Sequence, residues 1–330
     1  MKTSLCFLFA LALFSAGVAA QAPLFPNSVV SNNIDFVLET DADAFASLAF
    51  VGRADKEMPS SLSEELFDQN TFVFRATFTD GETLEIWCHS SFGTQARAQE
   101  YADKLCPRLG KLPDLQRNML NHVVVHNGNA GAFAELEGQF FVLYSENMDA
   151  RISTNDLEET VFHESVHASY QFMYQDSDIW ADAQADDPAF ITDYAQANED
   201  LEDMPEAALF AYTYLKHPGR LSPEIETWLQ ENNPNRLNFF RTIYMISTST
   251  EEATTEPRIL AYPNPTDGVF RLSLQGIVAG DRLEIFDAAG KQVRSADAVN
   301  EVNEVDLSDC AEGLYFIIAP GYRKTRIIKR

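Results

Sequence analysis

The feature that most constrains this chain is a pair of histidines four residues apart. His163 and His167 lie in the stretch LEETVFHESVHASYQ, residues 157–171, and Glu164 directly follows the first histidine. Residues four apart share one face of an α-helix, so a helix would bring both imidazoles to one place on its surface. Two imidazoles so placed can bind one Zn²⁺ ion through ring nitrogens at about 2.0–2.1 Å.

The start of this helix is marked by Asp156 and Glu159, which have the spacing of a capping box. We therefore predict a helix from Asp156 to about Tyr174. Glu164 would lie next to the histidine face, where it can act as general base toward a zinc-bound water molecule. This is the His-Glu-x-x-His pattern of metalloproteases.

A catalytic zinc site also needs a third protein ligand and an open fourth position. Downstream, NEDLEDMPEAALFAY predicts a second helix, from Glu199 to about Leu215. Four acidic residues share one face of it: Glu199, Glu202, Asp203 and Glu206. Such a face is often only solvated, but the opposite face of this helix is apolar, which indicates that the helix packs. One of these carboxylates is therefore a candidate third ligand.

The combination of HESVH with EDMPEAALFAY resembles the zincin metallopeptidases whose third ligand is a glutamate. It is especially similar to the lethal-factor-like branch, which carries a Glu-Asp-x-x-Glu helix, and the resemblance covers about residues 118–242. It implies an α+β zincin-like catalytic domain, a Zn²⁺ cofactor and a protein or peptide substrate. His163 and His167 would be ligands, and Glu164 would be the catalytic base.

The same resemblance implies that Glu202 is the third ligand and that Glu206 orients a ligand histidine. A second alignment of the same helix fits the Asn-Glu-x-x-x-Asp pattern of the thermolysin-like branch. In that register Glu199 would be the ligand and Asp203 its supporting carboxylate. We favour Glu202 because the flanking residues match the first branch better.

Two further residues bear on this assignment. Pro205 stands where the lethal-factor-like branch usually has alanine, and a proline inside a helix removes one backbone hydrogen bond and can kink the helix. That substitution puts the orientation of Glu206 in question. Tyr194 lies eight residues before Glu202, and the resemblance implies that its phenol donates to the oxyanion of the transition state.

The segment before the histidine helix has the pattern of an α+β fold. TFVFRATFTDGETLEIWCH alternates apolar residues on both sides of Asp80-Gly81, which predicts a β-hairpin. TQARAQEYADKLC predicts an amphipathic helix, and HVVVHNG and GQFFVLYSE predict two further strands. We expect residues 21–246 to be the catalytic domain. Within it, residues 21–110 are part of the fold, a separate lobe or a propeptide.

Both ends of the chain indicate export. Residues 1–20 have a positive start at Lys2, an apolar run and small residues up to Ala20, which predicts a secretory signal peptide. The run is shorter than the ~20 residues of a membrane span, and we expect no transmembrane span in the mature chain. The polar, Thr- and Glu-rich segment 247–258 predicts a linker.

The tail, residues 259–330, has the short alternating segments of a small all-β sandwich. YPNPTDG, LEIFDAAGKQV, GLYFIIA and the terminal RIIKR are similar to the C-terminal sorting domains of type IX secretion, which occur in Bacteroidota-like bacteria. The resemblance implies contact with outer-membrane secretion machinery and a secreted or cell-surface location.

Charge and cysteine usage add two expectations. The formal net charge of −26 repels phosphate backbones, so we expect no nucleic-acid partner.

Cys88 ends a predicted strand and Cys106 ends a predicted helix. Exported proteins meet oxidising conditions, so we favour a Cys88–Cys106 disulfide over two buried free thiols.

These observations together predict a secreted zinc endopeptidase. The alternative is a surface-displayed binding or adhesion protein whose zinc site is structural or decayed. A closed site with four protein ligands would favour that alternative. The sequence shows no cysteine or histidine placed as a fourth ligand, which favours the open, catalytic site.

Overall fold

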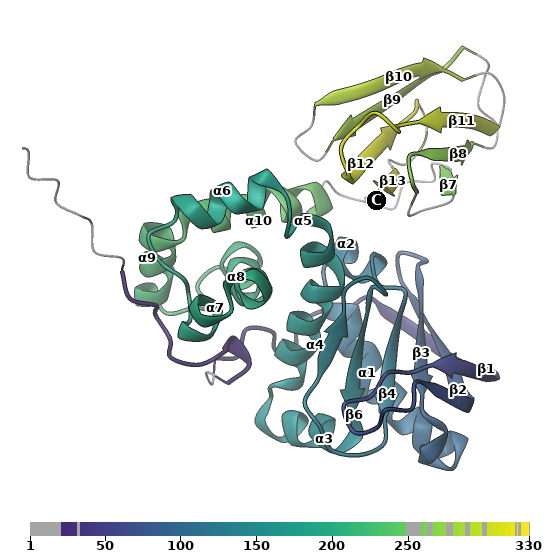
Figure 1. The fold of residues 1–330 in the computed structure, drawn as a ribbon, viewed down its shortest axis with the longest axis vertical. Helices are drawn as coiled ribbons and strands as arrows, with labels where there is room; N and C mark the ends of the chain where they lie inside the picture. The colour runs from purple at the N-terminus through teal and green to yellow at the C-terminus, as the bar shows by residue number, and fades with distance from the viewer. Residues whose placement is uncertain are drawn as a thin grey trace, which may run out of the picture.

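The computed structural model describes residues 21–31, 34–248, 259–262, 266–274, 280–287, 291–298, 302–320, 322 and 325–329. The predicted signal peptide and residues 249–258 of the predicted linker lie outside them. The described chain forms a larger α+β part followed by a β-rich tail (Figure 1). Across the described residues, no helix combines the length and the apolar character needed to cross a membrane.

The α+β part is built on a six-stranded mixed sheet with the order β1-β2-β3-β4-β6-β5. Strands β1 to β3 pair antiparallel, β3, β4 and β6 pair parallel, and β5 closes one edge antiparallel to β6. Their bounds are β1 Phe45–Glu57, β2 Phe67–Phe78, β3 Thr83–Cys88, β4 His122–His126, β5 Phe133–Glu135 and β6 Phe140–Tyr144.

The predicted hairpin around Asp80-Gly81 is confirmed: β2 and β3 pair directly, and Gly81 takes a φ of 84°, which glycine adopts without strain. The parallel pairs are an addition to the expected α+β pattern. Strands β3 and β4 are parallel because a helix lies between them and returns the chain to the same end of the sheet, whereas between β4 and β6 the chain returns through the edge strand β5. That helix is α1 (Gln95–Lys111), whose N-terminus is capped by the Thr94 hydroxyl.

Of the remaining helices, α2 lies between α1 and β4, and α3 to α10 follow β6 in two groups. Helices α3 and α4 lie against the sheet, and α4 separates the sheet from the helices that follow it (Figure 1). The bounds are α2 Asp114–Asn118, α3 Ser145–Thr154, α4 Leu157–Val166, α5 Phe172–Tyr174, α6 Asp178–Asp186, α7 Asp193–Ala197, α8 Glu199–Lys216, α9 Pro223–Asn232 and α10 Pro234–Thr248.

The predicted helix from Asp156 to Tyr174 is helical throughout, but it is not one regular α-helix. Between α4 and α5 the chain makes a π-helical turn, His167–Gln171, in which the N–H of Phe172 reaches the carbonyl of His167. Such turns inside α-helices often occur at functional sites. Here the turn begins at the second histidine of the pair.

The predicted capping box is wrong. The Asp156 side chain makes no capping hydrogen bond and instead accepts one from the Thr154 hydroxyl at 2.5 Å. The Glu159 carboxylate is buried and accepts the backbone N–H groups of Phe36 and Val37 at 3.0 and 3.2 Å. Backbone groups far away in the sequence, rather than the N–H of Asp156, thus satisfy this buried carboxylate.

Residues 21–110 share the sheet and the core of the histidine helix rather than forming a lobe of their own. One apolar cluster joins residues of this segment, such as Phe36, Phe74 and Leu105, to Phe162 of α4 and Phe210 of α8. The Phe36 and Phe210 rings meet edge to face at 4.7 Å. The N-terminal segment therefore packs directly on the two helices that carry the predicted site.

The predicted disulfide is also wrong in this structure. Cys88 and Cys106 are buried free thiols, and the Cys88 thiol donates to the carbonyl of Ala98. Burial raises the pKa of both thiols, that of Cys106 to about 12. They pack as small apolar residues between the end of β3 and α1.

The tail forms two antiparallel sheets with the orders β10-β9-β12-β13 and β11-β8-β7, which share one cluster of buried apolar residues. This arrangement agrees with the predicted small sandwich. The bounds are β7 Leu260–Tyr262, β8 Val269–Ser273, β9 Arg282–Asp287, β10 Gln292–Asp297, β11 Val302–Asp306, β12 Gly313–Ile318 and β13 Thr325–Lys329.

Candidate metal centre

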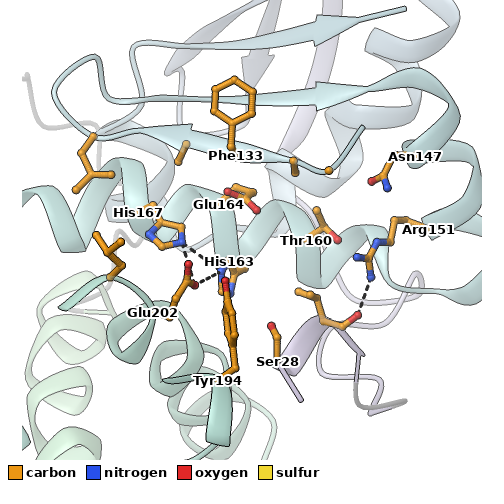
Figure 2. Close-up of a pocket in the computed structure, with 16 residues that line it drawn as sticks. Ser28, Phe133, Asn147, Arg151, Thr160, His163, Glu164, His167, Tyr194 and Glu202 are labelled. Carbon is orange, nitrogen blue, oxygen red and sulfur yellow. Dashed lines mark hydrogen bonds and ion pairs between the residues drawn. The ribbon is translucent and has the colours of Figure 1, made fainter. Parts of the chain in front are cut away.

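Three donor side chains from two packed helical segments converge on one point (Figure 2). The Nε2 atom of His163 lies 3.2 Å from Nε2 of His167 and 3.1 Å from Oε2 of Glu202, which is 3.5 Å from Nε2 of His167. Ligand atoms at 2.0–2.1 Å around a tetrahedral zinc ion are about 3.3 Å apart. The three distances therefore suit one small cation.

The hydrogen bonds of His167 fix which of its nitrogens faces this point. Its Nδ1 atom is hydrogen-bonded to the side-chain oxygen of Gln171. The side-chain nitrogen of Gln171 donates to the carbonyls of Asp200 and Leu201 at 3.2 and 2.7 Å, so its oxygen is the atom left to accept. Nδ1 of His167 therefore carries the proton, and Nε2 presents a lone pair.

The Nδ1 atom of His163 faces a carboxylate at ion-pair distance rather than at hydrogen-bond distance. This atom lies 3.6 Å from Oε1 of Glu206, which is completely buried on α8. That carboxylate favours a proton on Nδ1 and leaves Nε2 free to bind a metal. Two imidazole lone pairs and the Glu202 carboxylate then face each other, and a cation is the partner that satisfies all three.

The charges around the centre also favour a cation. Burial alone would lower the pKa of His163, but the hydrogen bond to Glu202 and the nearby Glu164 and Glu206 carboxylates outweigh it and raise that pKa to about 9. Burial would raise the pKa of Glu202, yet its hydrogen bonds to His163 and His167 hold it well below its usual range. Without a metal, the negative charges of these carboxylates stabilise a proton on His163. The same charges would stabilise a bound divalent cation.

Glu164 lies beside the histidines, on the side of a cleft of about 410 Å³. In Figure 2 its carboxylate stands between the histidine helix and Phe133 of the edge strand β5. Burial raises the pKa of Glu164, and the charges of His163 and His167 act in the opposite direction. The residue therefore combines access to the cleft with an increased affinity for a proton, as a general base requires.

Tyr194 lines the same cleft from helix α7, whose first turn is capped by the Thr192 hydroxyl. Its side chain is partly exposed and points toward His163 and Glu202 (Figure 2). Burial, the charge of Glu202 and a hydrogen bond to that carboxylate raise the pKa of Tyr194. The phenol is thus a protonated donor at the edge of the centre.

The structure brings Glu202 and Glu206 of α8 to the histidines, as the lethal-factor-like alignment requires. It does not bring Glu199 and Asp203 there, as the thermolysin-like alignment would require. Glu199 is exposed at the start of the helix, outside the three-residue cluster. Asp203 is fully buried on another face, where it pairs with the Arg236 guanidinium at 2.7 Å and accepts from Gln184 at 2.9 Å. Asp203 therefore supports the packing of α8 against α10.

Several residues that complete the centre were not predicted from the sequence. Gln171 follows His167 by four residues on one helical run, and that spacing was an available signal. Ser28 and Thr192, in contrast, donate to Glu206 from 178 and 14 residues away in the chain. No local pattern identifies Ser28, because only the folded chain brings it to α8.

The comparison with known families concerns the tail. Residues 260–329 match the model of the secretion system C-terminal sorting domain. The tail is a sorting domain. This confirms the type IX assignment made from its residues, and it implies contact with the secretion machinery and export to the cell surface or beyond. No curated protein matches the chain. The matched residues do not include His163, His167 and Glu202, which form the candidate metal centre.

Proposed function

We propose that this protein is an exported zinc-dependent endopeptidase, with a zincin-like α+β catalytic domain ahead of its sorting domain. One observation carries the proposal: a ring nitrogen of His163, a ring nitrogen of His167 and a carboxylate oxygen of Glu202 meet within metal-ligand spacing, directly beside Glu164 and an open cleft. A general base next to such a centre is the arrangement that metal-assisted hydrolysis needs.

His163, His167 and Glu202 would hold the zinc ion. When bound, the ion would activate a water molecule and polarise the carbonyl of the scissile peptide bond. Glu164 would take the proton from that water and deliver it to the leaving amine. Its buried setting raises its pKa and so helps it to hold the proton between the two events.

Tyr194 would stabilise the oxyanion. Its phenol stands at the cleft beside Glu202 and keeps its proton, because burial and the carboxylate raise its pKa. A neutral hydroxyl donor near the reacting carbonyl lowers the energy of the charged transition state.

The cleft suits an extended peptide. Strand β5 is the edge of the sheet, and Phe133 and Ala134 of this strand line the cleft opposite the histidine helix. A peptide can add to such an edge through main-chain hydrogen bonds, with its carbonyls held over the helix below. This supports a protein or peptide substrate.

The alternative of a surface-displayed binding protein with a structural zinc ion requires a fourth protein donor. Among the described residues, the cluster offers three. A centre with three protein ligands leaves one position open to solvent or substrate, which supports the enzyme.

The test compares the full chain with its Glu164→Gln variant on unfolded casein, with zinc content measured in both proteins. We expect one zinc ion in each and cleavage by the first alone, because the amide keeps the shape of the carboxylate but cannot act as base. Glu199→Gln is the matched control, since Glu199 is an exposed acid on α8. Equal cleavage by the Glu164→Gln variant would refute the assigned base, and absence of zinc would refute the metal centre.

A further inference from the structure

The segment Leu24–Val37, of which residues 32 and 33 lie outside the described chain, runs across the helices of the metal centre; we refer to it as the N-terminal strap. It begins beside the loop that precedes α7, where the N–H of Leu24 donates to the carbonyl of Ile191 at 3.0 Å and the carbonyl of Phe25 accepts from Asp193 at 2.8 Å. In Figure 2, Ser28 of the strap lies close to Tyr194, at the lower side of the cleft.

The strap binds the carboxylate that faces His163. Ser28 donates its hydroxyl to Oε1 of Glu206 at 2.5 Å, and the N–H of Val29 donates to Oε2 at 2.9 Å. The third donor is Thr192, at 3.0 Å. Glu206 is completely buried, and such a carboxylate keeps one orientation only while its oxygens are satisfied. Oε1, the oxygen held by Ser28, is also the one nearest Nδ1 of His163.

Two further contacts tie the strap to the histidine helix and its neighbour. The N–H groups of Phe36 and Val37 donate to the buried Glu159 carboxylate, which lies one turn before His163 on α4. The carbonyl of Val30 accepts from Arg151 of α3 at 2.7 Å. The strap therefore connects α3, α4 and α8, the helices on which the cleft and its donors depend.

We infer that the N-terminal strap is a permanent part of the metal centre and that Ser28 is a positioning residue. Through Glu206, Ser28 holds His163 with its Nδ1 atom toward the carboxylate and its Nε2 atom toward His167 and Glu202. This inference rests on the proposed metal centre. It also excludes the strap from any propeptide, because removal would leave the buried Glu206 carboxylate with Thr192 as the one remaining donor of the three and would take both backbone donors from the buried Glu159 carboxylate.

The experiment measures zinc affinity of the full chain by competition with a chelator. Ser28→Ala should weaken zinc binding about 10-fold, the lower end of the range found when a direct partner of a metal ligand is lost, because Ser28 acts on His163 through Glu206. Ser28→Thr keeps the hydroxyl and should restore the affinity to within about threefold of the original chain. Ser31→Ala is the matched control, since Ser31 is exposed in the same segment.

A thermal unfolding curve in the presence of EDTA separates positioning from general stability. If Ser28→Ala lowers the melting temperature without zinc but leaves zinc affinity within about twofold, the positioning role is refuted. If Ser28→Ala does not fold, Ser28→Cys, which keeps the size but donates weakly, should give an intermediate affinity. An affinity of Ser28→Cys equal to that of the original chain would also refute the role.

The readout does not require hydrolysis, so the two proposals can fail separately. A chain that binds zinc but cleaves no peptide, with the expected loss in Ser28→Ala, would refute the peptidase and support the strap. The N-terminal sequence of the exported, zinc-loaded protein gives an independent check. We expect it to begin before Ser28, and a start beyond Val37 would overturn the inference.

Discussion

The side-chain nitrogen of Gln171 donates to the main-chain oxygen of Leu201 at 2.7 Å. In an unbroken helix that oxygen would accept the N–H of residue 205, but Pro205 has none. Gln171 supplies the missing donor, and its oxygen binds Nδ1 of His167. One amide therefore completes α8 and orients a candidate zinc ligand. Helix α8 continues through Pro205, and the Glu206 side chain reaches His163.

We predict that Gln171→Met weakens zinc binding about 10- to 100-fold, because His167 loses the acceptor that fixes its tautomer. The unpaired oxygen of Leu201 should also cost about 1–3 kcal/mol of unfolding free energy. Chelator competition and urea unfolding measure the two effects. Gln196→Met, at an exposed position of α7, is the control. Unchanged zinc affinity would show that Gln171 supports only the helix.

The two registers of α8 give opposite predictions for two neighbouring acids. Glu202→Ala should abolish stoichiometric zinc binding, since it removes one of three donors. Glu199→Ala should bind zinc like the original chain, because Glu199 lies outside the cluster. Zinc content after dialysis distinguishes them. The reverse result would establish the thermolysin-like register.

Arg236 is expected to stabilise the fold without contributing to the metal centre. It pairs with Asp203 at 2.7 Å and Asp187 at 3.1 Å, and all three side chains are buried. Arg236→Met would leave two buried carboxylates uncompensated, which should lower the unfolding free energy by about 3–5 kcal/mol.

Zinc stoichiometry of Arg236→Met should be retained at temperatures where the variant is folded. Arg241→Met, on the same helix α10 but less buried, should change the unfolding free energy by less than about 1 kcal/mol. A loss of zinc from folded Arg236→Met would show that the Asp203 pair also shapes the centre.

Glu159 should make stability depend on pH. Burial raises the pKa of Glu159 from 4.5 to about 7, against the hydrogen bonds from Val37 and Phe36. An acid with a higher pKa in the folded state binds its proton more tightly there. Its stabilising contribution is therefore present below pH 4.5 and is lost as the pH rises through about 7.

The expected size of this loss is about 3 kcal/mol between those two pH values. Urea unfolding of the original chain and of Glu159→Gln, both with EDTA, should show this extra fall only in the original chain. The amide oxygen can still accept the two backbone N–H groups. Parallel pH curves for the two proteins would mean that Glu159 is ionised in the folded state throughout.

Thiol reactivity tests the unpaired cysteines. In the folded protein Cys88 and Cys106 should not react with a thiol reagent, because both are buried and burial raises the pKa of each thiol. In denaturant without reductant both should react. Peptide mapping identifies the labelled residues. A Cys88–Cys106 crosslink in the map would restore the disulfide prediction.

Local spacing in the sequence was sufficient to predict the helices that carry the candidate metal centre and the strands of the tail. The four-residue interval of the histidines placed them on one helical face, and the acidic helix was predicted at nearly its observed bounds. The expectation that its four acidic residues share one face is wrong, because Asp203 is buried against Arg236 while Glu199 is exposed. The hairpin at Asp80-Gly81 and the alternating segments of the tail were equally local. These predictions succeeded because each depends on neighbours in the chain.

The predictions of a capping box and of a disulfide were wrong because tertiary packing, rather than local spacing, decides the partners of these residues. Asp156 and Glu159 have the right spacing for a cap, but burial gave the Glu159 carboxylate partners more than 100 residues away. Cys88 ends β3 as predicted, but α1 continues past Cys106 to Lys111, and both cysteines serve as core residues.

By itself, then, the sequence determined which residues can carry the chemistry and that the chain is addressed for export. The tertiary structure alone decided which carboxylate of α8 faces the histidines, since Glu199, Glu202 and Asp203 differ only in the direction that packing gives them. It also brought Ser28 to Glu206, which is 178 residues away in the sequence. Helical periodicity acts over a few residues, whereas satisfying a buried carboxylate can recruit donors from anywhere in the fold.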